Sequence, residues 1–215
     1  MKRRAYDATS RQRAAQATRS LVLECARRLF VQNGYAGTTM SAIAHAAGVA
    51  LDTVYANVGR KPTLFRRLIE TAISGLDEPQ PAEERDYVRA IRVEPKAERK
   101  LEIYAQSLTR IHARLAPLFK VLQAASSADS DLATLWQEIS QRRAANMRLF
   151  ARDLAETGDL RKDLAEDMAA DIIWSMNSPE FYLLLVEHRR WSPEAFEHWL
   201  ADAWKRLLLR ELRRA

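Results

Sequence analysis

The chain has 215 residues and a formal net charge of +6, with 47% apolar and 29% charged residues, which excludes a chain that is disordered throughout. Six Gly and seven Pro are too few for a turn-rich all-β fold, and a single cysteine, Cys25, excludes an intrachain disulfide framework and a zinc site built from cysteines. No apolar run is long enough to span a bilayer or to act as a secretory signal, so we expect a cytoplasmic protein with no membrane partner.

The positive charge is concentrated near the N-terminus. Residues 1–67 hold 12 basic and 3 acidic residues, whereas the other 148 residues hold 22 basic and 25 acidic ones. This asymmetry indicates an N-terminal module that meets a polyanion. Residues 1–17 are polar and basic, and we expect them to form a mobile arm. The arm either contacts the polyanion or is a solvated tail.

Helical patterns follow the arm. Apolar residues at helical spacing predict a helix from Thr18 to Asn33. Thr39 then offers an N-cap for a short helix over residues 40–47, and Gly48 ends that helix. A second short helix follows the glycine. Two short helices joined by a Gly-containing turn predict a helix-turn-helix motif over about residues 40–59.

The rest of the chain predicts a larger bundle of helices. Two prolines and five acidic residues lie between residues 76 and 86, and we predict a linker over 77–95. Long helices follow over 96–215, with one helix ending and another beginning at Pro117. Ser178-Pro179-Glu180 and Ser192-Pro193-Glu194 repeat one helix-start signal, in which a Ser cap precedes Pro. No segment alternates as a strand would, so the predicted fold is all-α.

Residues 18–75 resemble the DNA-binding domain of TetR-type transcriptional regulators. The resemblance is carried in order by Ala26-Arg27-Arg28-Leu29-Phe30, Asn33-Gly34-Tyr35, Thr38-Thr39-Met40, Ile43-Ala44, Ala46-Ala47-Gly48-Val49, Thr53-Val54-Tyr55, and Lys61 with Leu64-Phe65. It implies a three-helix DNA-binding domain over 18–76, followed by a helical ligand-binding and dimerisation domain over 96–215.

The resemblance also implies roles for eight residues on double-stranded DNA. The hydroxyls of Thr39 and Tyr55 would meet phosphates, Asn57 would do likewise, and Lys61 would meet the backbone. Ala50, Leu51 and Thr53 would face base edges, where their apolar groups suit thymine methyl groups. Asp52 either accepts a hydrogen bond from cytosine or only places its charge at the positive end of a helix. Tyr55 is alternatively an aromatic residue at the edge of the core.

Four residues depart from the family pattern. Val58 stands where an aromatic residue is common, and Arg60 stands where a capping Ser or Asn is common. Ala50 stands where many relatives carry Ser or Asn, so the second short helix lacks a side-chain cap. Asp52 replaces a small or neutral residue, and its carboxylate is repelled by phosphate. These departures leave the operator sequence open.

The C-terminal region offers two further expectations. By its order in the family, the dimer contact is expected from segments 162–189 and 192–211. Three of the five Trp residues lie in these segments and Trp191 lies between them. Residues that combine apolar bulk with a few polar tips are expected to line a pocket for an unidentified small-molecule effector. They are Tyr104, His112, Phe119, Trp136, Met147, Phe150, Trp174 and Asn177. The alternative for each of these residues, and for the Trp residues, is a place in the core.

Signals for enzyme chemistry are missing from the sequence. It contains no Gly-rich phosphate loop, no His-Glu-x-x-His pair and no nucleophile elbow, so we expect no catalytic residue, cofactor or metal. The hypothesis is a homodimeric repressor that a small molecule releases from its operator. The alternative is a DNA-binding protein of architectural type without an effector.

Overall fold

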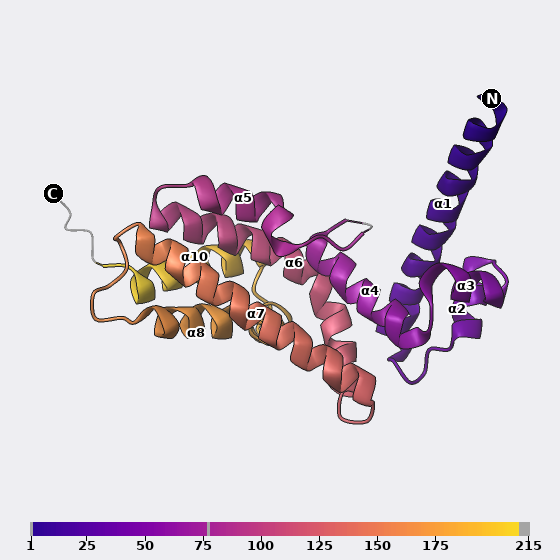
Figure 1. The fold of residues 1–215 in the computed structure, drawn as a ribbon. Coiled ribbons are helices and arrows are strands. Elements are labelled where there is room, and N and C mark those ends of the chain that lie inside the picture. The colour runs from indigo at the N-terminus through magenta and orange to yellow at the C-terminus, as the bar shows by residue number, and fades with distance from the viewer. Residues whose placement is uncertain (1, 77, 211–215) are drawn as a thin grey trace. The chain divides into compact units, whose positions relative to one another are not determined.

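The computed structural model describes residues 2–76 and 78–210, with side chains from Arg13 onward. Within these residues the regular elements are all helical (Figure 1), and the only strand-like pairing is one antiparallel bridge between Leu160 and Leu209. The protein is therefore all-α, as predicted. No helix in this part of the chain combines the length and the apolar character needed to cross a membrane.

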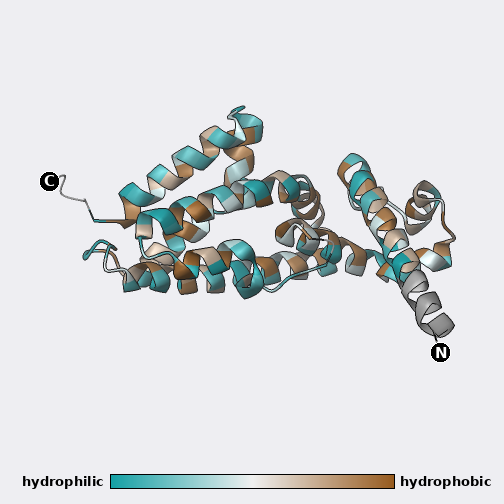
Figure 2. Cartoon of the chain, turned by 90° about the horizontal axis from the view of Figure 1, so that it is seen from above, coloured by the Kyte–Doolittle hydropathy of each residue, from teal (hydrophilic) through white to brown (hydrophobic). Residues whose placement is uncertain are grey.

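The helices follow one another with short connections. In chain order they are α1 (Lys2–Asn33), α2 (Met40–Ala47), α3 (Leu51–Val58), α4 (Lys61–Ser74), the 3₁₀-helix η1 (Ala82–Glu84), α5 (Asp86–Val93), α6 (Ala97–Ala125), α7 (Ser130–Glu156), α8 (Glu166–Met176), α9 (Pro179–Tyr182), the π-helix η2 (Leu183–His188) and α10 (Pro193–Leu208). Figure 2 shows hydrophobic and hydrophilic residues alternating along these helices, which is the pattern of amphipathic packing.

The chain divides into two compact units, and each unit consists of several separate segments of the sequence. The first consists of Met1–Thr71, Leu76–Pro79 and Pro117–Leu135. The second consists of Ala72–Gly75, Gln80–Ala116 and Trp136–Ala215. The packing thus groups part of the predicted C-terminal domain with the N-terminal helices. The domain boundaries expected from the sequence stay a prediction.

An aromatic cluster forms the centre of the first unit. The Phe30 ring stacks on Tyr35 at 5.6 Å, and both rings meet Phe65 edge-on. Phe30 and Phe65 have no exposed surface. Burial raises the pKa of the Tyr35 hydroxyl to about 12, so this ring stays neutral. The cluster fixes α1 against α4, and α1 also packs against both α2 and α3.

Helix α1 is longer than predicted. Its apolar stripe begins near Thr18, but the helix itself begins at Lys2 (Figure 1). Ala and Arg are strong helix formers, so the basic segment extends the helix without needing a buried face. The side chains of the predicted basic arm before Arg13 lie outside the described part of the chain, and the mobility of residues 1–17 stays a prediction.

Trp204 lies at the centre of the second unit. Its ring is fully buried and stacks on Tyr104, with centroids 5.4 Å apart and planes 8° apart. Tyr104 in turn meets Phe150 edge-on at 5.1 Å. These contacts join α10, α6 and α7 around one core.

Two sequence predictions about the second half of the chain need correction. Pro117 does not separate two helices, because α6 runs through it as one helix from Ala97 to Ala125. Proline removes one backbone hydrogen bond, and the buried neighbours Ala116 and Leu118 stabilise the helical path despite that loss. The stretch predicted as a linker, 77–95, holds η1 and α5, so much of it is helical.

The two Ser-Pro signals begin helices as predicted. Ser178 accepts a hydrogen bond from the Phe181 N–H at 3.0 Å, and Ser192 accepts one from the Ala195 N–H at 3.1 Å. The first helix is short, because α9 passes into the π-helix η2 after Tyr182.

Candidate nucleic-acid interface and ligand cavity

A tight turn joins α2 to α3. Gly48 ends α2 with φ 65°, a left-handed conformation that glycine adopts without strain. The Gly48 N–H donates to His45 O and the Val49 N–H to Ala44 O, both at 3.1 Å. These bonds satisfy the last carbonyls of α2 and direct the chain into α3. The helix-turn-helix predicted over about residues 40–59 is present.

Thr39 caps α2, as the sequence predicts. Its hydroxyl oxygen accepts a hydrogen bond from the Ala42 N–H at 3.0 Å. The residue is exposed, so the hydroxyl hydrogen can still be donated outward to a partner. The first turn of α2 therefore offers a hydroxyl and helix N–H groups to an anion.

Helix α3 presents an uncharged surface apart from one carboxylate. Val54 is fully buried against the rest of the unit, whereas Leu51 and Tyr55 keep 37% and 43% of their surface exposed. Ala50 makes no side-chain cap, as its sequence predicts, and is exposed. Asp52 is exposed in the first turn of α3, where the positive end of the helix stabilises a carboxylate. The partial exposure of Tyr55 fits both a phosphate contact and the alternative of an aromatic residue at the edge of the core.

Three more of the predicted interface residues are half-buried. Thr53 lies on α3 and its carbonyl accepts a hydrogen bond from Asn57 Nδ2 at 2.7 Å. The Asn57 amide hydrogen is therefore engaged within its own helix. Lys61 Nζ lies over the Tyr35 ring, 4.2 Å from its centroid, and burial lowers the pKa of this amine. The ring fixes the lysine at the start of α4.

A cavity of about 330 Å³ lies in the second unit. Of the eight residues predicted to line a pocket, five line this cavity: Tyr104, His112, Met147, Phe150 and Asn177. They come from α6, α7 and the residue that ends α8. Side chains far apart in the sequence therefore meet at one place.

Phe119, Trp136 and Trp174 do not line the cavity. Phe119 is buried in the first compact unit, because α6 passes from one unit to the other at Pro117. Trp174 instead donates from Nε1 to the Ser140 carbonyl at 3.4 Å, and its ring lies under the Arg143 guanidinium. Trp136 is half-buried on α7 away from the cavity.

Four of the five shared residues form a buried polar cluster. Asn177 Nδ2 donates to the Tyr104 hydroxyl at 2.7 Å and to Met147 Sδ at 2.9 Å. His112 Nε2 donates to the Asn177 carbonyl at 3.0 Å, because a carbonyl oxygen can only accept. Burial lowers the pKa of His112 to about 3, so the ring is neutral. His112 is thus both a hydrogen-bonded interior histidine and a cavity residue.

Part of the cavity lining comes from residues 77–95, which the sequence predicts as a linker. Tyr87, Val88 and Ile91 on α5 line it. Their spacing of i, i+1 and i+4 is that of an amphipathic helix, so a signal for this wall does exist in the sequence. Arg143 on α7 also lines the cavity and was not predicted, since nothing local distinguishes it from other arginines.

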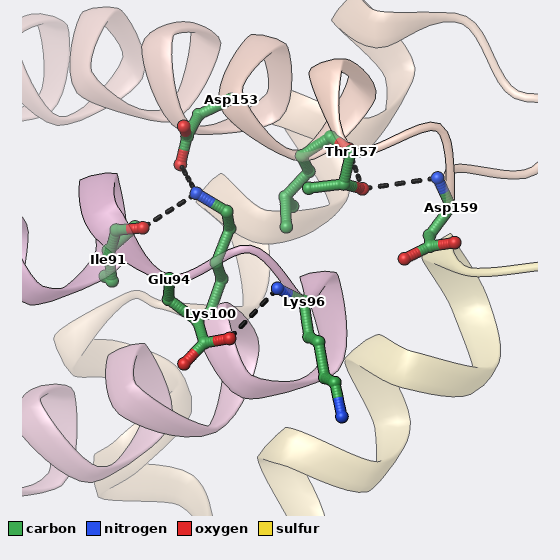
Figure 3. Close-up of polar contacts among 8 residues, drawn as sticks. Ile91, Glu94, Lys96, Lys100, Asp153, Thr157 and Asp159 are labelled. Atoms are coloured by element: carbon green, nitrogen blue, oxygen red, sulfur yellow. Dashed lines mark hydrogen bonds and ion pairs between the residues drawn. The ribbon is translucent and has the colours of Figure 1, made fainter.

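A buried ion pair holds α5 in place (Figure 3). Lys100 on α6 is 3% exposed, and its Nζ donates to the Ile91 carbonyl at 2.7 Å and to Asp153 Oδ2 at 2.8 Å. Ile91 lies on α5 and Asp153 on α7, so one amine joins three helices. Because Ile91 and Asp153 both line the cavity, the pair fixes its shape.

In the described part of the chain, no group of three or more His, Cys, Asp and Glu side chains could hold a metal ion. Cys25 is buried, and its thiol donates to the Ala46 carbonyl at 3.4 Å, which joins α1 to α2.

Comparison with known proteins agrees with the helix-turn-helix geometry. Residues 22–68 match the model of the family described as bacterial regulatory proteins, tetR family. The matched segment spans part of α1 and all of α2 and α3, with the capped turn between them. Residues 22–68 therefore form a helix-turn-helix segment of the TetR type. No curated protein matches the chain by sequence.

Solved structures share their fold with almost the whole chain. NalD, the secondary repressor of the MexAB-OprM multidrug efflux pump in Pseudomonas aeruginosa, superposes with a TM-score of 0.73 at 18% identity, over 93% of this chain and 100% of NalD. A putative TetR-family transcriptional regulator from Mesorhizobium loti gives 0.63 at 20% identity, over 91% and 98% of the two chains. The SmeT–triclosan complex gives 0.65 at 18% identity, over 91% and 93%.

Proposed function

We propose that this protein is a homodimeric transcriptional repressor of the TetR type that binds a specific DNA operator and is released from it by a small molecule. The observation that carries the proposal is the exposed face of α3, which follows a capped α2 and a glycine turn. A helix of this kind enters a major groove, while the preceding helix contacts the backbone. In this role Leu51, with Ala50 and Thr53, contacts base edges, and Asp52 adjusts the base preference.

The proposed phosphate contacts come from the ends of helices. The Thr39 hydroxyl keeps a hydrogen to donate, and the exposed Tyr55 hydroxyl offers another. Lys61 adds a cation, held over the Tyr35 ring. Asn57 has its amide hydrogen engaged by Thr53, so only its oxygen and its second hydrogen remain for DNA. Such contacts set the register of the protein on DNA without reading sequence.

A dimer is proposed through segments 162–189 and 192–211, the described part of which ends at residue 210. Large apolar side chains are exposed on these segments, where a solvated surface would favour polar ones. They are Met168, Leu184, Trp199 and Leu207. A two-fold dimer would place its two α3 helices on half-sites about 34–36 Å apart, or a multiple of that distance.

The cavity supports the small-molecule part of the proposal. It lies in the second unit, it is lined by apolar and aromatic side chains with a few buried polar groups, and its volume is at the lower end of the range for ligand sites. SmeT, which shares the fold, is known in complex with triclosan. A ligand that binds one dimer geometry more tightly than another would shift the equilibrium away from DNA binding.

The test of the function is selection of bound duplexes from a random library at fixed salt. We expect a two-fold symmetric consensus, because an isologous dimer reads a pseudo-palindrome. Enrichment without a consensus would favour the architectural alternative. No enrichment at all would count against DNA binding by the free protein.

Substitutions on α3 and α4 should separate base reading from backbone contact. We expect Leu51→Ala to change the ratio of affinities for two bases at one operator position by about fivefold, because it removes apolar contact with a base. Lys61→Ala should weaken binding to all sequences and reduce the slope of log K against log salt by about 1. Fluorescence anisotropy on the selected operator and its single-base variants measures both. Equal losses on every operator for Leu51→Ala would contradict the assignment.

A further inference from the structure

Part of the cavity lining suits a flat apolar body. Tyr104, Phe150 and Tyr87 line it, and the Tyr87 and Tyr104 rings stack with centroids 6.1 Å apart. Leu108 and Ile111 continue this apolar surface along α6. A volume of about 330 Å³ is roughly that of ten water molecules in the liquid, which limits the ligand to a small molecule.

The polar cluster in the cavity lining offers only hydrogen-bond acceptors to a ligand. The donors of the polar cluster are all engaged, since the Asn177 amide hydrogens face Tyr104 and Met147 and the His112 Nε2 hydrogen faces the Asn177 carbonyl. His112 Nδ1 and Asn177 Oδ1 are buried acceptors without a partner among the described residues. The two residues are 2% and 1% exposed. A buried acceptor without a donor costs free energy, so a ligand hydroxyl or N–H is favoured here.

Arginines dominate the charge of the cavity. Four arginines line it against two carboxylates, Glu83 and Asp153, and Asp153 is already paired with Lys100. The arginines are Arg85, Arg92, Arg142 and Arg143. A cationic ligand would be repelled by this lining, whereas an anion would be attracted.

Arg143 is the arginine best placed to bind that anion. It is half-buried, and its guanidinium stacks on the Trp174 ring at 4.7 Å. Among the described residues it makes no ion pair, and its buried Nε has no hydrogen-bond partner. Glu180 is near enough to favour the charged guanidinium, but Oε2 of Glu180 also lacks a partner. A half-buried guanidinium without hydrogen bonds is stabilised by a carboxylate, which it binds through two parallel bonds.

From this arrangement we propose that the cavity binds a small aromatic carboxylic acid that carries a hydroxyl group. Its carboxylate pairs with Arg143, its ring lies against Tyr87, Tyr104 and Phe150, and its hydroxyl donates to the acceptors of His112 and Asn177. The inference deepens the proposed function and rests on it, since this acid would be the effector that releases DNA.

Four probes test the ligand class by isothermal titration calorimetry on the full chain. They are 4-hydroxybenzoate, its uncharged counterpart 4-hydroxybenzamide, benzoate without the hydroxyl, and the phenyltrimethylammonium cation. We expect 4-hydroxybenzoate to bind about tenfold more tightly than the amide or benzoate, because the amide lacks the negative charge and benzoate lacks the hydroxyl. The cation should not bind. Tightest binding by the amide or the cation, or no binding by any probe, would overturn the proposal.

Variants of two arginines on α7 assign the carboxylate contact. Arg143→Gln should weaken 4-hydroxybenzoate about tenfold to a hundredfold and leave the amide unchanged. Arg152→Gln is the matched control, because Arg152 is exposed on the same helix and does not line the cavity. Arg143→Lys keeps the charge and should recover part of the affinity. Circular dichroism shows whether each variant is folded, and equal losses for the acid and the amide with Arg143→Gln would contradict the contact.

The operator from duplex selection separates this inference from the proposed function. If the protein selects a consensus but 4-hydroxybenzoate neither binds nor releases it, the ligand class is wrong and the regulator stands. If the acid binds through Arg143 but no consensus is selected, the ligand class stands and the proposed DNA function is wrong.

Discussion

Replacing Lys100 with Ala is expected to lower the free energy of unfolding by about 3 kcal/mol. The substitution leaves the Asp153 carboxylate, whose side chain is only 25% exposed, without its partner. It also removes the hydrogen bond from α6 to the Ile91 carbonyl, so α5 loses one of its links to the rest of the unit. Urea denaturation followed by far-ultraviolet circular dichroism measures the loss.

The double variant Lys100→Met with Asp153→Leu is the control for that experiment. Replacing both charges by apolar groups of similar size avoids an unpaired buried charge and is often nearly neutral. The Ile91 carbonyl still accepts a hydrogen bond from the Glu94 N–H at 3.3 Å. We therefore expect the double variant to recover most of the stability. A double variant as unstable as Lys100→Ala would show that the ion pair and its hydrogen bonds stabilise the fold themselves, and that the loss does not come from an unpaired carboxylate.

Replacing Trp204 with Ala is expected to cost about 3–5 kcal/mol, because it opens a large cavity in the core of the second unit. The Trp204 ring is fully buried and stacks on Tyr104, which is itself part of the ligand cavity wall. The loss is measured by denaturant unfolding of the purified chain. A smaller loss, under about 1 kcal/mol, would mean that the surrounding helices collapse into the space.

Trp204→Phe is the matched variant. The buried Nε1 of Trp204 has no hydrogen-bond partner among the described residues, so exchanging the indole for a phenyl ring loses packing but no polar contact. We expect a cost well below that of Trp204→Ala, since most of the aromatic contact with Tyr104 remains. A cost equal to that of Trp204→Ala would indicate that the full indole outline is required.

The ion pair and the aromatic core both bear on the cavity. Lys100 positions α5, which supplies one wall, and Trp204 supports Tyr104, which supplies another. A cavity held at two places by buried contacts keeps its shape before a ligand arrives. Preorganisation of this kind lowers the entropic cost of binding. Milder substitutions at either place should therefore weaken the proposed effector as well as the fold.

Local chemistry is what the sequence by itself determined. Thr39 caps α2, Gly48 takes the left-handed turn, and Ser178 and Ser192 each begin a helix, all as predicted. Each of these features depends on residues within a few positions of one another, so the local sequence is enough to predict it. The same holds for the ordered motifs of residues 18–75, whose residue types and spacing are enough to indicate the TetR family.

Contacts between distant residues were decided only by the tertiary structure. Nothing near Pro117 predicts that α6 continues through it, because packing on both sides of the proline outweighs the lost hydrogen bond. The sequence likewise does not predict that Lys100 pairs with Asp153, 53 positions away. Nor does it predict that Nε of Arg143 has no hydrogen-bond partner among the described residues. Helical periodicity specifies which face of a helix is apolar, but not which helix will cover it. For this reason the helix-turn-helix could be predicted from its own residues, whereas the cavity required the fold.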